Sequence, residues 1–295
     1  ERLQYVSTAY VSGAARGTFR ETDLDVGQGF KNHYEETKFQ AEVEVVRSKV
    51  PHTTYRPGVV VWGACPPEMA HHTDVGRRLG LAVIDGLADL HMVDPAAVDL
   101  AGLGRPDGFL ERQVSGWKKR WNLAALPDSP PETQEVGDRL AATMPSSRYV
   151  SILHNDFKLD NCQFDADDPD RVKSVFDWDQ ATLGDPFVDV GITLNYWPDP
   201  ADVAGLEPIV NPGMESLGLP PRSEVTERYG ARTGFDVDGI RWYEAFAAWK
   251  TAVILQQLYA RWVRSESTDP RMAERGPMVA GQVRRAAAIL EGTAP

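Results

Sequence analysis

The stretch LHNDFKLDNCQFD, residues 153–165, places several polar side chains where flanking apolar residues indicate a buried segment. His154, Asp156 and Asn161 form the pattern H-x-D-x-x-x-x-N. The β-rich segments YVSIL and VKSVFDW predict a strand on each side of this loop. Asn and Asp also favour ordinary turns, so the pattern alone leaves a turn open as an explanation. The apolar segment VFDWD, which places Asp177 beyond a predicted hairpin, favours a functional site.

These residue types suit phosphoryl transfer, which needs a carboxylate beside the acceptor hydroxyl and oxygen ligands for Mg²⁺. Asp156 suits the first role. Asn161 and Asp177 suit the second, because Mg²⁺ prefers carboxylate and amide oxygens. Lys158 is predicted to place a positive charge near the transferred phosphoryl group, and His154 to brace the catalytic loop.

Residues from about 74 to 290 resemble the C-terminal lobe of the aminoglycoside phosphotransferase and choline kinase superfamily, above all its acyl-CoA dehydrogenase-linked branch. The resemblance is carried by LADLHMVDPAAVDLAGLGRPDGFLERQV, LHNDFKLDNCQFD, VFDWDQATLGDPFVDVG and YEAFAAWKTAVILQ. It implies an α+β, protein-kinase-like C-lobe that is mostly helical with short β-hairpins. It also implies phosphorylation of a small-molecule hydroxyl with ATP and Mg²⁺.

The same resemblance implies roles for individual residues. Asp156 would be the catalytic base, and Asn161 and Asp177 would be the metal ligands. Asp185 and Asp189, in GDPFVD, would be mainly structural.

Helical spacing of apolar residues predicts a helix over residues 74–93. Residues 107–121, 135–144 and 239–264 are also predicted to be helical. The helix over 107–121 contains the basic and aromatic segment WKKRW, with Trp117 and Trp121 on one face. A solvated helix face with two tryptophan anchors explains this segment better than a phosphate or nucleic-acid site.

The N-terminal part of the chain has an α/β rhythm. Residues 3–11 and 53–63 are β-rich, whereas residues 32–48 contain many helix formers. Asn32 is a candidate N-cap for that helix, with Glu35 three residues later.

This part resembles the second half of an extended short-chain dehydrogenase/reductase of the thioester and fatty-acyl reductase branch, a partial Rossmann-type segment. The resemblance is carried by YVSTAYVSG, Tyr34-x-x-x-Lys38 and YRPGVVVWG. Tyr34 and Lys38 share a helix face, where an ammonium lowers the pKa of a tyrosine for proton transfer. Ser7 or Thr8 would hydrogen-bond the carbonyl oxygen. Since the fingerprint G-x-G-x-x-G is absent, we expect neither NADP binding nor hydride transfer from NADPH.

The two resemblances divide the chain into a reductase-like segment at 1–64, a junction at 65–73 and a phosphotransferase C-lobe at 74–295. No glycine-rich phosphate loop or strand-borne lysine is recognisable before the C-lobe. We therefore expect Mg·ATP to bind no tighter than about the millimolar range, near 4 kcal/mol, with slow or absent turnover. An impaired phosphotransferase, a non-catalytic kinase-like binding protein and a reductase remnant all remain open.

Composition narrows the classes of partner. The net charge of −12 argues against a nucleic acid or an anionic membrane as the main partner. Cys65 and Cys162 have neither zinc-ligand nor disulfide-framework spacing. Without a membrane-length apolar run or signal peptide, we expect a cytoplasmic protein, and its oligomeric state stays open. A start at Glu1 rather than Met suggests a fragment.

Overall fold

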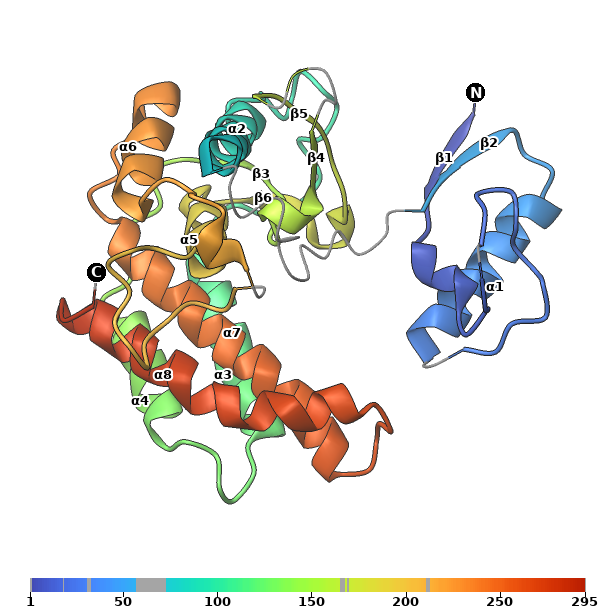
Figure 1. The fold of residues 1–295 in the computed structure, drawn as a ribbon. Helices are drawn as coiled ribbons and strands as arrows, with labels where there is room; N and C mark the ends of the chain where they lie inside the picture. Colours follow the sequence, from blue (N-terminus) through green and yellow to red (C-terminus); the bar gives the residue numbers. More distant parts are fainter. Residues whose placement is uncertain are drawn as a thin grey trace. The chain divides into compact units, whose positions relative to one another are not determined.

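The computed structural model describes residues 2–17, 19–30, 33–56, 73–164, 168, 170–210 and 213–294. The chain consists of two compact units, Glu1–Gly63 and Ala64–Pro295 (Figure 1). The predicted N-cap Asn32, Cys65 and residues 57–72, which include most of the predicted junction, lie outside the described residues.

The first unit is a strand–helix–strand arrangement. β1 (Leu3–Val6) and β2 (His52–Tyr55) pair in parallel, and α1 (His33–Arg47) lies in the connection between them. Two parallel strands require such a crossover, because the chain must return to the same end of the sheet before it pairs again. The predicted α/β rhythm is therefore present, while the Rossmann-type ancestry of the segment stays a prediction.

The first strand is shorter than the predicted range of residues 3–11. After β1 the chain turns into a 3₁₀ helix, η1 (Ala9–Ser12). The Thr8 side chain accepts a hydrogen bond from the Tyr10 N–H at 3.3 Å, which caps this turn. A local side-chain bond of this kind competes with extension of the strand.

The second unit is mostly helical, and four of its helices lie close to the predicted ranges. Its helices are α2 (Thr73–His91), α3 (Phe109–Ala124), α4 (Glu132–Ala142), α5 (Phe187–Asn195), α6 (Arg222–Thr233), α7 (Ile240–Val263) and α8 (Gly276–Glu291). Short 3₁₀ helices are η3 (Leu159–Asn161), η4 (Trp178–Gln180), η5 (Met214–Ser216) and η6 (Pro270–Arg275). Within the described ranges, no helix is long and apolar enough to cross a membrane.

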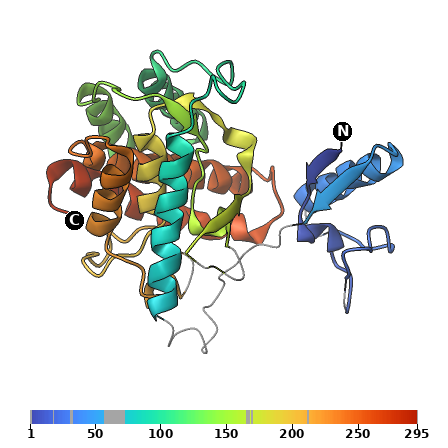
Figure 2. The same cartoon turned by 90° about the horizontal axis from the view of Figure 1, so that it is seen from above.

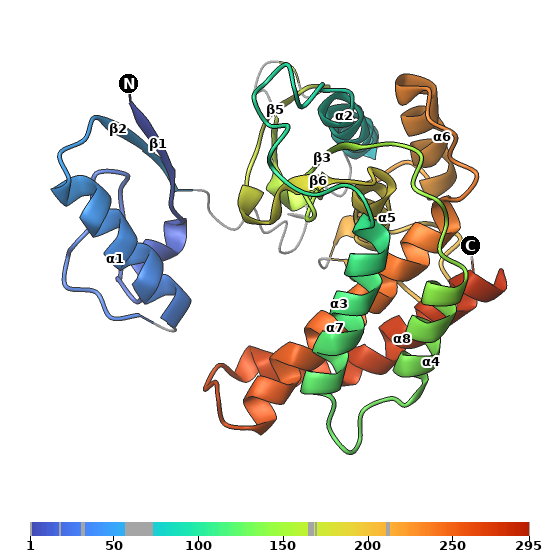
Figure 3. The same cartoon turned by 180° about the vertical axis from the view of Figure 1, so that it is seen from behind.

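Helix α7 forms the centre of this unit. Its residues from Trp242 to Val253 are buried around the whole circumference, which is the pattern of a helix enclosed by others. Helices α3, α4, α5 and α8 pack on it (Figure 3). Contact with α5 is close at Gly191, where a Cβ atom would clash with the Tyr243 carbonyl oxygen. On another side of the unit, α6 packs beside α2 (Figure 2).

The strands pair differently from the simplest prediction. The two segments that flank the catalytic loop, β3 (Ser151–Leu153) and β5 (Val172–Val175), belong to different two-stranded sheets. β3 pairs antiparallel with β6 (Thr182–Gly184), and β5 pairs antiparallel with β4 (Cys162–Phe164). A hairpin does precede Asp177, but its first strand, β4, lies inside the stretch LHNDFKLDNCQFD, residues 153–165. The many polar residues of that stretch obscured the strand in the sequence.

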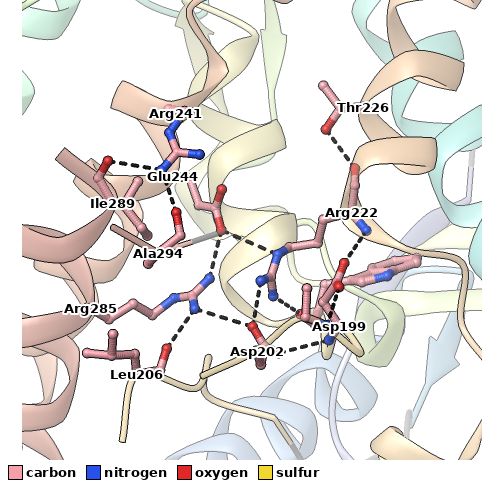
Figure 4. A network of polar contacts seen from close by, with 12 residues as sticks. Asp199, Asp202, Leu206, Arg222, Thr226, Arg241, Glu244, Arg285, Ile289 and Ala294 are labelled. Atoms are coloured by element: carbon pink, nitrogen blue, oxygen red, sulfur yellow. Dashed lines mark hydrogen bonds and ion pairs between the residues drawn. The ribbon is translucent and has the colours of Figure 1, made fainter. Parts of the chain in front are cut away.

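A buried ionic network fixes the long connection between α5 and α6. Arg222 and Arg285 converge on Glu244 and Asp202 (Figure 4). Arg285 donates to Glu244 at 2.7 Å, and Arg222 donates to Asp202 at 2.5 Å. Because the four side chains come from α6, α8, α7 and this connection, the network ties all of them together.

Candidate active site

The start of the loop after β3 is anchored by hydrogen bonds to one buried carboxylate. Asp189, on α5, accepts the backbone N–H of His154 at 2.6 Å and that of Asn155 at 2.7 Å. The His91 Nε2 atom lies 3.4 Å from the same carboxylate. Asp189 is fully buried, so these bonds hold the start of the loop against the helical core. This matches the structural role that the resemblance implied for Asp189.

His154 braces the loop from inside. Its Nδ1 accepts the Asp156 N–H at 3.2 Å. Its Nε2 lies 2.7 Å from the Phe176 carbonyl oxygen. Since one ring nitrogen accepts, the other must carry the hydrogen and donate to Phe176. The ring therefore couples Asp156 to the residue that precedes Asp177.

Asp156 is hydrogen-bonded to Lys158 and Asn161, the two loop residues predicted to act with it. Both of its carboxylate oxygens accept from the Lys158 ammonium, at 2.9 and 2.8 Å. The Asn161 side-chain amide donates to the Asp156 carbonyl at 2.7 Å and to its carboxylate at 3.2 Å. Burial lowers the pKa of Lys158, but the charge of Asp156 and the proximity of Tyr196 outweigh it, so the pKa is raised.

Asp177 lies at the end of the β4–β5 hairpin in a left-handed backbone conformation, with φ of 67°. The Phe176 N–H donates to the Asn161 carbonyl at 2.8 Å, which brings the two ends of the hairpin together. Partial desolvation of the carboxyl, followed by the negative charges of Asp179 and Asp156, raises the pKa of Asp177, although the residue as a whole is exposed. Lys158 and His154 oppose this rise, so three residues of the loop, His154, Asp156 and Lys158, act electrostatically on Asp177.

Asn161 and Asp177, the predicted metal ligands, are of residue types that suit a Mg²⁺ ion. Asn161 donates with its amide nitrogen, which leaves its amide oxygen as the atom able to bind a cation. A cation would also relieve the repulsion that raises the pKa of Asp177. Within the described residues, no three His, Cys, Asp or Glu side chains form a metal-binding group. One amide and one carboxylate are nevertheless typical of Mg²⁺ held with a phosphate substrate.

Beside the loop lies a cavity of about 540 Å³. Its lining includes Asn155 of the catalytic loop and Trp117 of α3, together with four basic residues, Arg105, Arg112, Arg120 and Lys250. The Arg120 guanidinium stacks on the Trp117 ring at 4.4 Å. The two tryptophans of WKKRW have different surroundings, since Trp121 is buried in the core whereas Trp117 lines this cavity.

Lys250 is a site residue that the sequence analysis missed. It lies within α7, is only 7% exposed and lines the cavity. Its Nζ donates to the Asn155 carbonyl at 3.4 Å and lies 5.5 Å from the centre of the Trp117 ring. A lysine within the otherwise apolar run AFAAWKTAVIL was the signal, because buried lysines are rare unless they are paired or functional.

The residues predicted for a reductase site lie in the first unit. The Lys38 Nζ is 5.7 Å from the centre of the Tyr34 ring, so the two share a face of α1. The Ser7 hydroxyl donates to Glu42 on the same helix, and the Thr8 hydroxyl caps η1. Both hydroxyls therefore have local structural partners, and the reductase site stays a prediction.

Comparison with known proteins shows that the chain is similar to part of two acyl-CoA dehydrogenase family members. The chain is 28% identical over 227 residues to acyl-CoA dehydrogenase family member 10 of Mus musculus, which covers 76% of this chain and 21% of that protein. It is 31% identical over 196 residues to family member 11 of Homo sapiens, which covers 64% of this chain and 24% of that protein. The chain thus spans about a quarter or less of these relatives.

A solved structure agrees with the fold. A Ralstonia eutropha protein assigned to the aminoglycoside phosphotransferases superposes with a TM-score of 0.68 at 26% identity, covering 81% of this chain and 72% of the other. The model of the phosphotransferase enzyme family matches residues 41–243, more than half of the chain. That match begins within α1, upstream of the predicted 65–73 junction. The kinase-like fold expected from the resemblance is thereby confirmed, and the chain belongs to the phosphotransferase enzyme family.

Proposed function

We propose that this chain transfers a phosphoryl group from ATP to a hydroxyl group of a small molecule, with Mg²⁺. The observation that carries the proposal is the clustering of Asp156, Lys158 and Asn161 within hydrogen-bonding distance. Asp177 lies near enough for the charges of Asp156 and Lys158 to shift the pKa of its carboxyl. Membership of the phosphotransferase family supports it. In this proposal the nucleotide is a substrate and Mg²⁺ is the cofactor.

Asp156 is the proposed base. Its carboxylate accepts the proton of the acceptor hydroxyl as that oxygen bonds to the γ-phosphorus, and the bond from phosphorus to the β-phosphate oxygen breaks to release ADP. Its backbone is fixed by the bond to His154, so the carboxylate has a defined position before the acceptor arrives. His154 is accordingly a positioning residue rather than a group that exchanges protons with the substrate.

In this proposal the Lys158 ammonium also binds the transferred phosphoryl group. It is held by both oxygens of Asp156, and its ammonium also lies 5.0 Å from the centre of the Tyr196 ring. A γ-phosphoryl group would compete for this ammonium and so free the Asp156 carboxylate for its role as a base. Asn161 and Asp177 would hold Mg²⁺, which neutralises part of the phosphate charge when bound.

The test is ATP turnover in the presence of a panel of hydroxyl compounds, followed by detection of the phosphorylated product. Asp156→Asn keeps the size of the side chain but removes the base, and we expect turnover to fall about 10²- to 10⁴-fold. Asp128→Asn is the matched control. It makes the same chemical change at an exposed aspartate in the loop before α4 and should retain full turnover.

Calorimetric titration with Mg·ATP separates an enzyme from a kinase-like binding protein. Binding of Mg·ATP that is lost in Asp177→Ala, without any turnover across the panel, would favour the binding protein. Turnover that is unchanged in Asp156→Asn contradicts the proposed mechanism.

A separate assay tests the reductase remnant. NADPH oxidation with an aldehyde or thioester, abolished by Tyr34→Phe, would support that alternative.

A further inference from the structure

The cavity beside the catalytic loop has the opposite charge from the chain as a whole. The chain carries 43 acidic residues against 31 lysines and arginines. The cavity is lined by three arginines and one lysine, and none of the described residues that line it is acidic. A concave, basic site in an acidic protein concentrates anions, because the low-dielectric walls focus its field.

Lys250 gives this positive charge a buried component. Its side chain is enclosed between α3 and the catalytic loop, and its ammonium makes a long hydrogen bond to the Asn155 carbonyl and faces the Trp117 ring. Among the described residues no carboxylate forms an ion pair with it. A buried charge is unfavourable unless a partner of opposite charge compensates it. The cavity that Lys250 lines is the place from which such a partner could come.

The arginines are arranged to act with Lys250. Arg112, which lines the cavity, donates to the backbone carbonyls of Arg105 and Asp107, and these bonds orient its guanidinium. Arg120 is held over Trp117. Guanidinium groups that are already oriented bind planar oxyanions with two parallel hydrogen bonds, whereas an ammonium acts as a point charge. The lining therefore combines both kinds of anion donor.

We propose that Lys250 and these arginines form an anion subsite that binds a carboxylate or phosphate group of the acceptor. The inference rests on the proposed function, since the subsite would lie next to Asp156 through Asn155 of the same loop. It makes Lys250 a specificity-determining residue. The subsite would favour acceptors that carry an oxyanion and would disfavour polyamines such as aminoglycosides.

The test is calorimetric titration of the full chain at pH 7, without ATP or Mg²⁺. Glycerol 3-phosphate and glycerate are the anionic probes, one for each oxyanion, and glycerol and kanamycin are the neutral and cationic comparisons. We expect at least one anion to bind more tightly than glycerol and kanamycin. In Lys250→Met the affinity for that anion should fall at least about tenfold, which is the scale for loss of a charged hydrogen bond.

Two further variants keep the result interpretable. Lys119→Met removes a lysine from the same helix as Trp117 but outside the cavity lining, and it should bind the anion as the wild type does. Lys250→Arg keeps the charge and should retain most of the affinity. Circular dichroism shows whether Lys250→Met is folded, and any thermal stabilisation by the anion is compared only within one variant.

The outcomes decide between the two proposals. Equal affinity for glycerol and both anions, tighter binding of kanamycin, or undiminished anion binding by Lys250→Met would each overturn the anion subsite. Because the titrations contain no nucleotide, none of these outcomes affects the assay of Asp156. Conversely, anion binding that depends on Lys250 in a chain without turnover would support the subsite and contradict the phosphotransferase proposal.

Discussion

The carboxylate of Asp189 accepts the backbone N–H of His154 at 2.6 Å, and this bond connects the hydrophobic core to the proposed site. Asp189 lies on α5, which packs against the central helix α7. His154 in turn holds Asp156 and the end of the β4–β5 hairpin. The position of the catalytic loop thus depends on a residue that would not contact the substrate.

Removing this anchor should destabilise the fold. In Asp189→Ala, two buried N–H groups lose their acceptor, and each such loss costs about 1–3 kcal/mol. We expect the free energy of unfolding in urea to fall by about 3 kcal/mol. Asp179→Ala, an exposed carboxylate near the same site, should change it by less than about 0.5 kcal/mol. A loss below 1 kcal/mol in Asp189→Ala would mean that water replaces the carboxylate.

The buried ionic network predicts a contrast with a surface ion pair. Arg285→Met leaves Glu244 and Asp202 with one buried guanidinium instead of two, and breaking a buried pair costs about 3–5 kcal/mol. Arg148→Met breaks an ion pair with Asp236 in which the Arg148 side chain is 68% exposed, for which we expect less than about 1 kcal/mol. Urea denaturation of both variants checks this. Similar losses in the two would show that the network contributes no more than the surface pair.

The helices and the polar loop could be predicted from the sequence, because both depend on the local pattern of residues. The apolar spacing located α2, α3 and α4 within a few residues, because each buries a periodic face. The long run of apolar helix formers located α7, which is buried on all sides. The spacing of His154, Asp156 and Asn161 predicted that one loop carries all three, and hydrogen bonds connect them there. The strand partners were not predictable, since three-residue strands carry almost no periodic signal and their pairing is decided by the tertiary structure.

The cavity was not predictable for a related reason. Arg112, Arg120 and Lys250 come from α3 and α7, which are separated by more than a hundred residues in the chain. Only the packing of these helices brings the charges to one site. The sequence showed a basic, aromatic segment and a lysine in an apolar helix, but nothing local connects the two.

The Cys162 thiol should be unreactive in the folded protein. Burial, reinforced by the charge of Asp160, raises its pKa to about 12. Since the thiolate is the reactive species, the labelling rate at pH 8 should be roughly 10³-fold below that of an exposed cysteine. A Cys65→Ser background leaves one thiol to follow with a chromogenic disulfide reagent. Labelling in urea should be rapid, and rapid labelling without urea would show that this hairpin opens readily.

Lys250 should lower the stability of the folded chain at neutral pH. Burial lowers its pKa to about 8 from 10.5; Asp189 and Asp156 oppose the shift, whereas Arg120 and Lys158 reinforce it. The unfolded state therefore binds the proton more tightly than the folded state, and the resulting destabilisation is complete below pH 8 and absent above 10.5. Lys250→Met should raise the free energy of unfolding at pH 7 by on the order of 3 kcal/mol. This gain should shrink when urea denaturation is repeated near pH 10.

The same pKa predicts how anion binding depends on pH. An oxyanion binds the charged form of Lys250, so its affinity should be constant below pH 8 and should decrease as the ammonium loses its proton at higher pH. Glycerate is the suitable probe because its carboxylate stays ionised throughout this range. The arginines of the cavity remain charged, so the decrease should level off rather than continue to zero. In Lys250→Arg the affinity should be independent of pH between 7 and about 10. A wild-type affinity that is equally flat would show that the arginines alone bind the anion and that the buried lysine does not contribute.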